Sequence, residues 1–125
     1  MIQSGTYLNV CDNSGIVSGH CIRVLNSRKG TGFIGSNLVL SAIKFKLFRK
    51  SKLKKSTNSV YYGLVVRTKF PLLRFTGMKL SFEDNGVVIL DQKKNLIGNR
   101  INGPVPYELR IKGYTKLLLL APFIV

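Results

Sequence analysis

Short β-prone stretches separated by clusters of turn-forming residues dominate this sequence, and no segment carries a long helical pattern. The clearest hairpin joins residues 6–11 to residues 16–25, because the Asp-Asn-Ser-Gly run at 12–15 consists entirely of turn formers. Further strands are predicted at residues 37–48, 61–68, 79–82 and 87–91. Many short strands at this spacing favour a closed or nearly closed small barrel, because closure leaves few exposed strand edges.

The later part of the chain carries different signals. Asp84-Asn85-Gly86 is a strong tight-turn signal and predicts a hairpin between the strands at 79–82 and 87–91. Residues 107–110 and 114–120 are expected to form short helices that cap the barrel. No repeat, linker or shift in composition divides the chain, so residues 1–125 are expected to form a single domain with this helical cap.

Apolar residues and lysines alternate strictly between residues 43 and 47. Because successive side chains of a strand point to opposite faces, one face should be apolar while the other carries Lys44 and Lys46. The strand at 61–68 is nearly all apolar before Arg67. The predicted inward-facing residues are Ile43, Phe45, Leu47, Leu64 and Val66.

Positive charge is the strongest clue to function. The chain has 20 Lys and Arg against 5 Asp and Glu, a net charge of +15. Such an excess indicates a polyanionic partner, and nucleic acid is favoured because its phosphates bind Lys and Arg with release of counterions. An anionic membrane surface is the alternative, but it calls for a basic amphipathic helix or a basic cluster beside an apolar anchor, and no long helical pattern is present. The N-terminus resembles neither a signal peptide nor a transit peptide.

The basic residues concentrate at one predicted hairpin tip. Residues 49–55 read Arg-Lys-Ser-Lys-Leu-Lys-Lys, and they follow the strand that carries Lys44 and Lys46. A solvated loop is the alternative reading, but contact with phosphates is preferred; such contacts position a protein without reading sequence. The residues predicted to contact nucleic-acid phosphates are Arg28, Lys29, Lys44, Lys46, Arg49, Lys50, Lys52, Lys54, Lys55, Arg67, Lys69, Arg74 and Arg110.

One motif suggests a dinucleotide site. Residues 30–35 read Gly-Thr-Gly-Phe-Ile-Gly and match G-x-G-x-x-G. That fingerprint requires a helix after the glycines and an acidic residue about 20 positions further on. Here a strand is predicted next, and the acid position falls among the lysines at 52–55. A loop with Arg28 and Lys29 available to phosphate is therefore preferred.

Catalytic and metal-binding constellations are weak. Cys11, His20 and Cys21 lack the four-ligand spacing of a zinc site, and each thiol is expected to be a small core hydrophobe. Glu83 and Asp84 are adjacent, so in a strand they would diverge and form a poor acid–base pair. No nucleophile elbow is present. We therefore expect no enzyme activity, no metal and no cofactor. Two cysteines without a secretory signal also indicate a reducing compartment.

Four blocks of the sequence carry a family resemblance. They are Met1-Ile2-Gln3 with residues 8–10 and 12–15; residues 21–25; residues 63–69 with Phe82, Asn85, Val88 and Ile89; and residues 98–101 with 103–105, 108–110 and 120–122. Together the blocks resemble the large-subunit ribosomal protein fourteen family, the universal L-fourteen family, in its bacterial and organellar form. The match spans nearly the whole chain with its spacing kept.

The sequence departs from the family pattern at four positions. Ile16 replaces a small residue, Thr76 stands where Asp, Asn or Ser is usual, Asn99 replaces a threonine, and Phe123 replaces an acid. Residues 28–53 are also diverged and more basic. These departures leave the fold unchanged but bear on local contacts, especially at Asn99.

The resemblance implies a mostly β fold: a closed five-stranded β-barrel with a projecting β-ribbon and two short C-terminal helices. It implies a structural role in the large ribosomal subunit, with binding to large-subunit rRNA beside the L-three and L-nineteen family proteins. It further implies an inter-subunit contact with small-subunit rRNA, on a surface where a ribosome-silencing factor also docks. By motif position that surface contains Asn99, Arg100 and Lys116.

Two questions stay open at this stage. The bias toward Asn, Lys, Ile, Leu and Phe suggests an A/T-rich gene, and together with the divergence it favours a mitochondrial matrix ribosome and an organelle-encoded chain. The alternative locations are a plastid and the bacterial cytoplasm. The alternative to a ribosomal role is a free-standing nucleic-acid-binding barrel of the OB or cold-shock kind.

Overall fold

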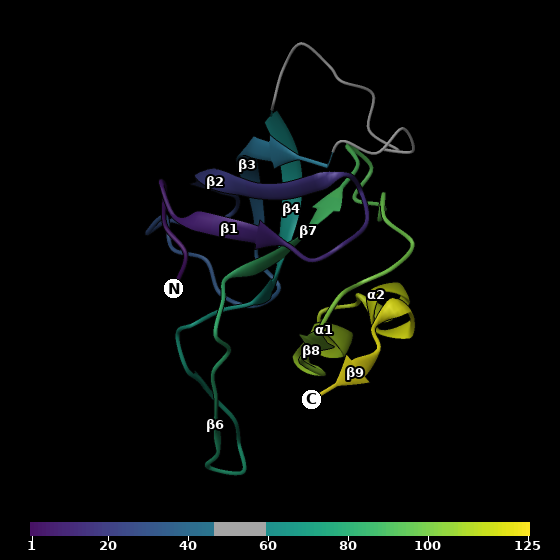
Figure 1. The fold of residues 1–125 in the computed structure, drawn as a ribbon. Coiled ribbons are helices and arrows are strands. Elements are labelled where there is room, and N and C mark those ends of the chain that lie inside the picture. The colour runs from purple at the N-terminus through teal and green to yellow at the C-terminus, as the bar shows by residue number, and fades with distance from the viewer. Residues whose placement is uncertain (47–59) are drawn as a thin grey trace.

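The structure, a computed structural model, describes residues 1–46 and 60–125. Five strands form a closed barrel in the order β1-β2-β3-β4-β7 (Figure 1). Their bounds are β1 Tyr7–Val10, β2 Ile16–Val24, β3 Asn37–Phe45, β4 Val60–Arg67 and β7 Gly86–Leu90. All neighbours are antiparallel except β1 and β7, whose parallel pairing closes the barrel. The predicted mostly β, five-stranded barrel is confirmed.

The curvature of the barrel comes from β2. Its pairing with β3 shifts register between Ile16 and Ser18, between Ser18 and Gly19, and between Cys21 and Arg23. Such irregularities bend and twist a strand, which closure of a small barrel requires. Gly19 is needed where the strands approach most closely, because a Cβ at this residue would lie 2.6 Å from the carbonyl oxygen of Ser41.

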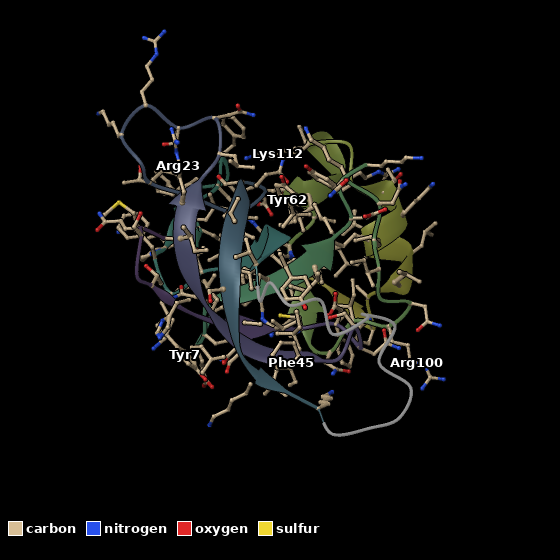
Figure 2. All side chains as sticks on the ribbon, turned by 90° about the horizontal axis from the view of Figure 1, so that it is seen from above. Tyr7, Arg23, Phe45, Tyr62, Arg100 and Lys112 are labelled. Atoms are coloured by element: carbon tan, nitrogen blue, oxygen red, sulfur yellow. The ribbon has the colours of Figure 1, made fainter. Side chains whose placement is uncertain are left out.

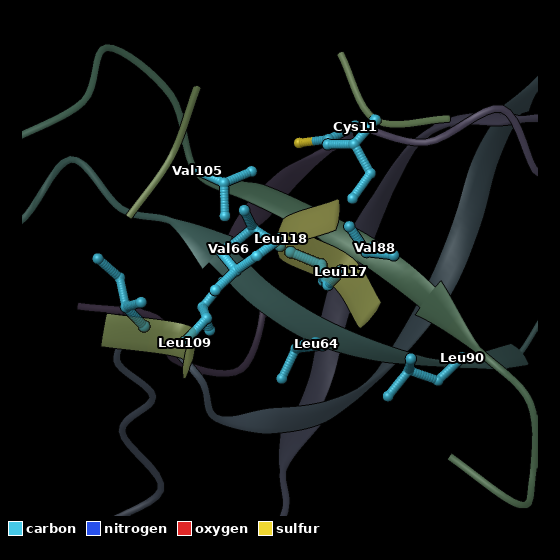
Figure 3. Packing of buried hydrophobic residues seen from close by; sticks show 11 residues of the cluster. Cys11, Leu64, Val66, Val88, Leu90, Val105, Leu109, Leu117 and Leu118 are labelled. Atoms are coloured by element: carbon cyan, nitrogen blue, oxygen red, sulfur yellow. The ribbon is translucent and has the colours of Figure 1, made fainter. Parts of the chain in front are cut away.

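Two hydrophobic clusters lie on opposite faces of β4 and β7. The barrel interior contains Val65, Val87 and Ile89 together with side chains from β1, β2 and β3. The other face of the same two strands carries Leu64, Val66, Val88 and Leu90, which pack under the C-terminal helices (Figure 3). Both faces of β4 and β7 are therefore buried, which explains why these strands are apolar without alternation.

This arrangement corrects part of the predicted core. Leu64 and Val66 are fully buried, but they face the helices and not the barrel interior. Ile43 and Phe45 are 44% and 40% exposed, so their predicted burial is wrong. The reason is that β3 pairs with β4 only from Asn37 to Ser41, and its last residues extend past that contact alongside β2. Leu47 lies outside the described residues.

The C-terminal segment covers one side of the barrel. Helix α1 (Glu108–Ile111) and helix α2 (Thr115–Leu120) confirm the two predicted short helices. Leu109, Leu117 and Leu118 anchor them on β4 and β7 (Figure 3). Strand β9 (Phe123–Ile124) then returns to pair in parallel with β8 (Pro104–Val105). None of the helices in the described ranges is both long and apolar enough to span a membrane.

A small hairpin projects from the barrel. It consists of β5 (Leu72–Leu73) and β6 (Lys79–Leu80), with Gly77 at φ +84° in the connecting turn (Figure 1). The predicted hairpin between residues 79–82 and 87–91 is therefore wrong. Strand β7 already has β1 on one side and β4 on the other, so it has no free edge for β6. The predicted basic tip at 49–55 lies outside the described residues.

Candidate nucleic-acid interface

The loop that resembles a dinucleotide fingerprint leads into a strand. Gly30 and Gly35 have positive φ values of +69° and +84°, and Gly32 forms a β-bridge with Ile2. Strand β3 follows at Asn37, so no helix N-terminus faces the glycines. The strand predicted after the glycines is confirmed, whereas the fingerprint requires a helix at that place. Arg28 and Lys29, in the same loop, are exposed.

The cysteines are unsuited to nucleophilic chemistry. Cys11 and Cys21 are free thiols and both are 2% exposed, as expected of small core hydrophobes. Burial raises the pKa of the Cys11 thiol to about 12 and also raises the pKa of Cys21. Both thiols are thus protonated at neutral pH, whereas a nucleophile or metal ligand must be a thiolate. Among residues 1–46 and 60–125, no three His, Cys, Asp or Glu side chains gather as a metal site would require.

Exposed cations occur on several elements. Of the predicted rRNA-binding residues that the structure describes, those with exposed side chains lie in the loop after β2, at the end of β3, after β4 and in α1. They are Arg28, Lys29, Lys44, Lys46, Lys69 and Arg110. Five others, Arg49, Lys50, Lys52, Lys54 and Lys55, lie outside the described residues.

Arg67 has a different environment, inside the protein. Its Nε and Nη2 donate to the two carboxylate oxygens of Asp84 at 3.0 and 3.2 Å. Its Nη1 donates to the carbonyl oxygens of Asn102 and Pro104, and Nη2 also donates to Cys11 Sγ at 3.0 Å. A guanidinium group has five N–H donors, and these contacts occupy all of them. Arg67 therefore joins β4 to the segments on either side of it.

Arg74 is also engaged within the protein. It lies beside β5, and its Nε and Nη2 donate to the Glu108 carboxylate at 2.6 and 3.1 Å. Nη2 also donates to a main-chain oxygen of Val125, and the guanidinium lies 4.4 Å from the centre of the Tyr107 ring. The hydrogen bond to Glu108 raises the pKa of Arg74. This contact fastens the projecting hairpin to α1 and to the C-terminus.

Most of the acidic residues make contacts inside the protein. The only ion pairs in the described ranges are Arg67–Asp84 and Arg74–Glu108. Asp12 is 1% exposed, and its carboxylate accepts hydrogen bonds from the Ser14 hydroxyl and from the backbone N–H groups of Ser14 and Ile89. Of the chain's 5 acidic residues, only Glu83 and Asp91 take no part in the contacts just described. The exposed cations therefore lack carboxylate partners within the described part of the chain.

The structure brings together two of the three residues of the predicted inter-subunit surface. Asn99 and Lys116 line one groove of about 520 Å³, with Leu96, Leu119 and Leu120 as its apolar part. Arg100 follows Asn99 in the chain, and its exposed side chain extends outward at the edge of the molecule (Figure 2). Leu119 is 85% exposed. We call Asn99, Arg100, Lys116 and Leu119 the groove surface.

The sequence model of the family described as ribosomal protein L14p/L23e matches residues 1–125. The chain belongs to this family. As a member of the ribosomal protein L14p/L23e family, it is a structural component of the large ribosomal subunit. The family is of a structural and non-enzymatic kind.

Sequence reasoning missed several residues that bear on how this L14p/L23e protein could bind its partners. Lys94 lines a cavity of about 230 Å³ together with Lys116, so it extends the positive charge beside the groove surface. Lys93 precedes it and is exposed. The adjacent lysines at 93 and 94 could have indicated this positive charge from the sequence. Asn13 was also missed, because nothing in its own sequence neighbourhood shows that it contacts residues 99 and 100.

Proposed function

We propose that residues 1–125 act as one domain that binds large-subunit rRNA through exposed lysines and arginines on several elements. The observation that carries the proposal is the charge balance: a net charge of +15 with most acidic groups already engaged inside the fold. Cations without internal partners are stabilised by a polyanion, and binding to RNA releases the counterions condensed on its phosphates.

The proposed contact residues are those with free donors. They are Arg28, Lys29, Lys44, Lys46, Lys69 and Arg110, together with the basic residues at 49–55 on the evidence of sequence alone. Arg67 and Arg74, which the sequence had placed in this set, are left out because their guanidinium donors are engaged within the protein. Such contacts would fix the position of the protein on rRNA without reading its sequence.

The groove surface is proposed to face the small subunit. Lys116 supplies positive charge to the groove, Leu119 adds apolar surface there, and the exposed Arg100 follows the groove residue Asn99 in the chain. This combination suits an rRNA phosphate at an inter-subunit contact. It also suits a protein partner such as a ribosome-silencing factor, as the family resemblance implies. Proteins of the L-three and L-nineteen families are the proposed neighbours within the large subunit.

The compartment is a further part of the proposal. The composition and the divergence of the chain support a mitochondrial ribosome and an organelle-encoded gene, with a plastid or a bacterium as alternatives. Fractionation of cells that express a tagged copy, followed by detection of the tag in ribosomes of each compartment, distinguishes these locations.

Co-sedimentation tests the proposed function against a free-standing OB-like barrel. An integral ribosomal component, which would also pack against neighbouring ribosomal proteins, is expected to stay with the large subunit through a wash in high salt. A free-standing barrel held by phosphate contacts alone is expected to dissociate, because such binding weakens steeply with salt. Recovery of the protein in the unbound fraction after the wash would contradict the proposal.

A further inference from the structure

The turn at residues 12–15 packs directly against the loop that carries Asn99 and Arg100. Asn13 is half-buried, and its Oδ1 accepts hydrogen bonds from the backbone N–H groups of Asn99 at 2.9 Å and Arg100 at 3.3 Å. Its Nδ2 donates to Asn99 Oδ1. One side chain therefore holds two consecutive backbone amides and a side-chain amide of a loop 86 residues further along the chain.

Other contacts hold the same two segments together. Asp12 forms an antiparallel bridge with Ile101, and the N–H group of Asn102 donates to the carbonyl oxygen of Cys11 at 2.7 Å. Gly98 is buried against the turn, and a Cβ at this position would lie 2.9 Å from both Asn13 Oδ1 and Asp12 Cβ. The absence of a side chain at residue 98 thus lets the loop reach Asn13.

The turn is itself rigidly held, so it can serve as a fixed support. Asp12 Oδ1 accepts from the Ser14 N–H and hydroxyl groups, and Asp12 Oδ2 accepts from the N–H group of Ile89 in β7 at 2.9 Å. Gly15 has a φ of +109°, a conformation that other residues rarely adopt. The position of Asn13 is therefore fixed by the barrel wall.

We infer that Asn13 is a positioning residue for the groove surface: it holds the backbone of residues 99 and 100 so that Arg100 points outward to the partner. The inference rests on the proposed inter-subunit role of Arg100. In this arrangement the Asn99 side chain is turned onto Asn13, and Arg100 is the residue of the pair that extends from the molecule (Figure 2). The side-chain amides of Asn13 and Asn99 thus pair with each other.

The test uses large subunits reconstituted with variant proteins, and it measures their affinity for small subunits by light scattering. Asn13→Ala removes both acceptor contacts and the Nδ2 donor contact to Asn99, and subunit joining is expected to weaken at least about fivefold, as suits the loss of neutral hydrogen bonds. Gly98→Ala places a methyl group against Asn13 and is expected to weaken joining in the same direction. Asn102→Ala is the matched control, because Asn102 is an exposed asparagine of the same segment with no side-chain hydrogen bond to the described residues; joining should stay unchanged.

A second readout separates positioning from a general loss of stability. Hydrogen exchange of the variant proteins should show faster exchange at the amides of Asn99 and Arg100 in Asn13→Ala, with the barrel amides unchanged. Asn13→Asp keeps an acceptor for both amides, so their protection should be retained. Uniformly faster exchange, or failure of Asn13→Ala to enter the large subunit, would assign Asn13 a structural role and overturn the inference.

A third variant distinguishes failure of this inference from failure of the proposed function. Arg100→Glu reverses the charge that the loop is proposed to present. If Arg100→Glu weakens joining and Asn13→Ala does not, the inference about Asn13 fails and the inter-subunit role stands. If Arg100→Glu leaves joining unchanged, the proposed role of the groove surface fails, and the inference fails with it.

Discussion

Arg67 illustrates how residue type alone misleads in a strongly basic chain. Basic composition assigned this arginine to RNA, yet its guanidinium donates to Asp84, Cys11 and two carbonyl oxygens within the protein. The arginine follows a run of apolar residues in a strand that is buried on both faces. That run of apolar residues was a signal in the sequence that Arg67 is buried, and a charged group in a core requires internal partners.

Removing the partner of Arg67 should therefore destabilise the fold. We expect Asp84→Ala to lower the free energy of unfolding by about 2 kcal/mol, because it leaves a largely buried guanidinium without its carboxylate. Glu83→Ala is the matched control, since Glu83 is exposed and makes no ion pair with the described residues. Urea denaturation of both variants measures the difference. Equal stability of the two would show that the Arg67–Asp84 pair is not structural.

Asp12 gives a prediction about pH. Burial raises its pKa above the ordinary value of 3.8, and the hydrogen bonds from Ser14 and Ile89 oppose that shift only in part. Because the folded-state pKa is raised, the contribution of Asp12 to stability is full below pH 3.8 and declines as pH rises through the raised pKa. An NMR titration of the Asp12 carboxyl carbon should give a midpoint above 3.8. A midpoint at or below that value would contradict the assigned cause.

At the scale of elements, the strands that form the barrel wall were predictable and their partners were less so. Alternation and turn formers located β1, β2, β3, β4 and β7 within a few residues. The same alternation misplaced Ile43 and Phe45, because periodicity shows which residues share a face but not whether a neighbouring strand covers it. Strand β6 was predicted to pair with β7. The sequence does not reveal that β1 pairs in parallel with β7 and so occupies the edge that β6 would need.

The hairpin of β5 and β6 depends on the Arg74 contact. Arg74→Lys removes the paired hydrogen bonds to Glu108, because a lysine cannot reproduce the forked guanidinium geometry. We expect faster hydrogen exchange at the hairpin amides of Arg74 and Gly77, and at Val125 of the C-terminus, while the barrel amides keep their protection. Unchanged exchange at these amides would show that the hairpin holds its position without the contact.

The basic run at 49–55 gives a prediction from sequence alone, since these residues lie outside the described ranges. Replacing Lys50, Lys52, Lys54 and Lys55 together by Ala should reduce the salt dependence of binding to rRNA fragments by about 0.7–0.9 in slope per lost phosphate contact. Filter binding over a series of salt concentrations measures the slope. An unchanged slope would show that the run is solvated and makes no phosphate contact.

At the scale of the whole molecule, the fold separates two kinds of cation. Arg67 and Arg74 hold the barrel, the hairpin and the C-terminus together, whereas the exposed lysines and arginines have no carboxylate partners among the described residues. Charge and fold class could be predicted from sequence, and so could the family. The division between internal and external cations could not, because it depends on contacts such as Arg74–Glu108 between residues that are distant in the chain.

The groove surface gives the prediction at this scale. The double variant Arg100→Glu with Lys116→Glu should fold and enter the large subunit, because both residues are exposed and the apolar anchors of α2 are unchanged. Subunit joining or the docking of a silencing factor should weaken, since two positive charges become negative. The fraction of large subunits in whole ribosomes and a pull-down with variant particles measure these effects. Failure of assembly would instead show that the two residues bind large-subunit rRNA or hold the fold.

A density map of the large subunit that contains this protein tests the central claim most directly. The account predicts rRNA phosphates within about 3 Å of the side-chain nitrogens of the exposed cations, with Lys44, Lys46 and Lys69 among them. It also predicts that Arg67 and Arg74 keep their contacts with Asp84 and Glu108 in the particle. A map in which the exposed lysines face solvent, while Arg67 or Arg74 has left its carboxylate for a phosphate, would contradict the account.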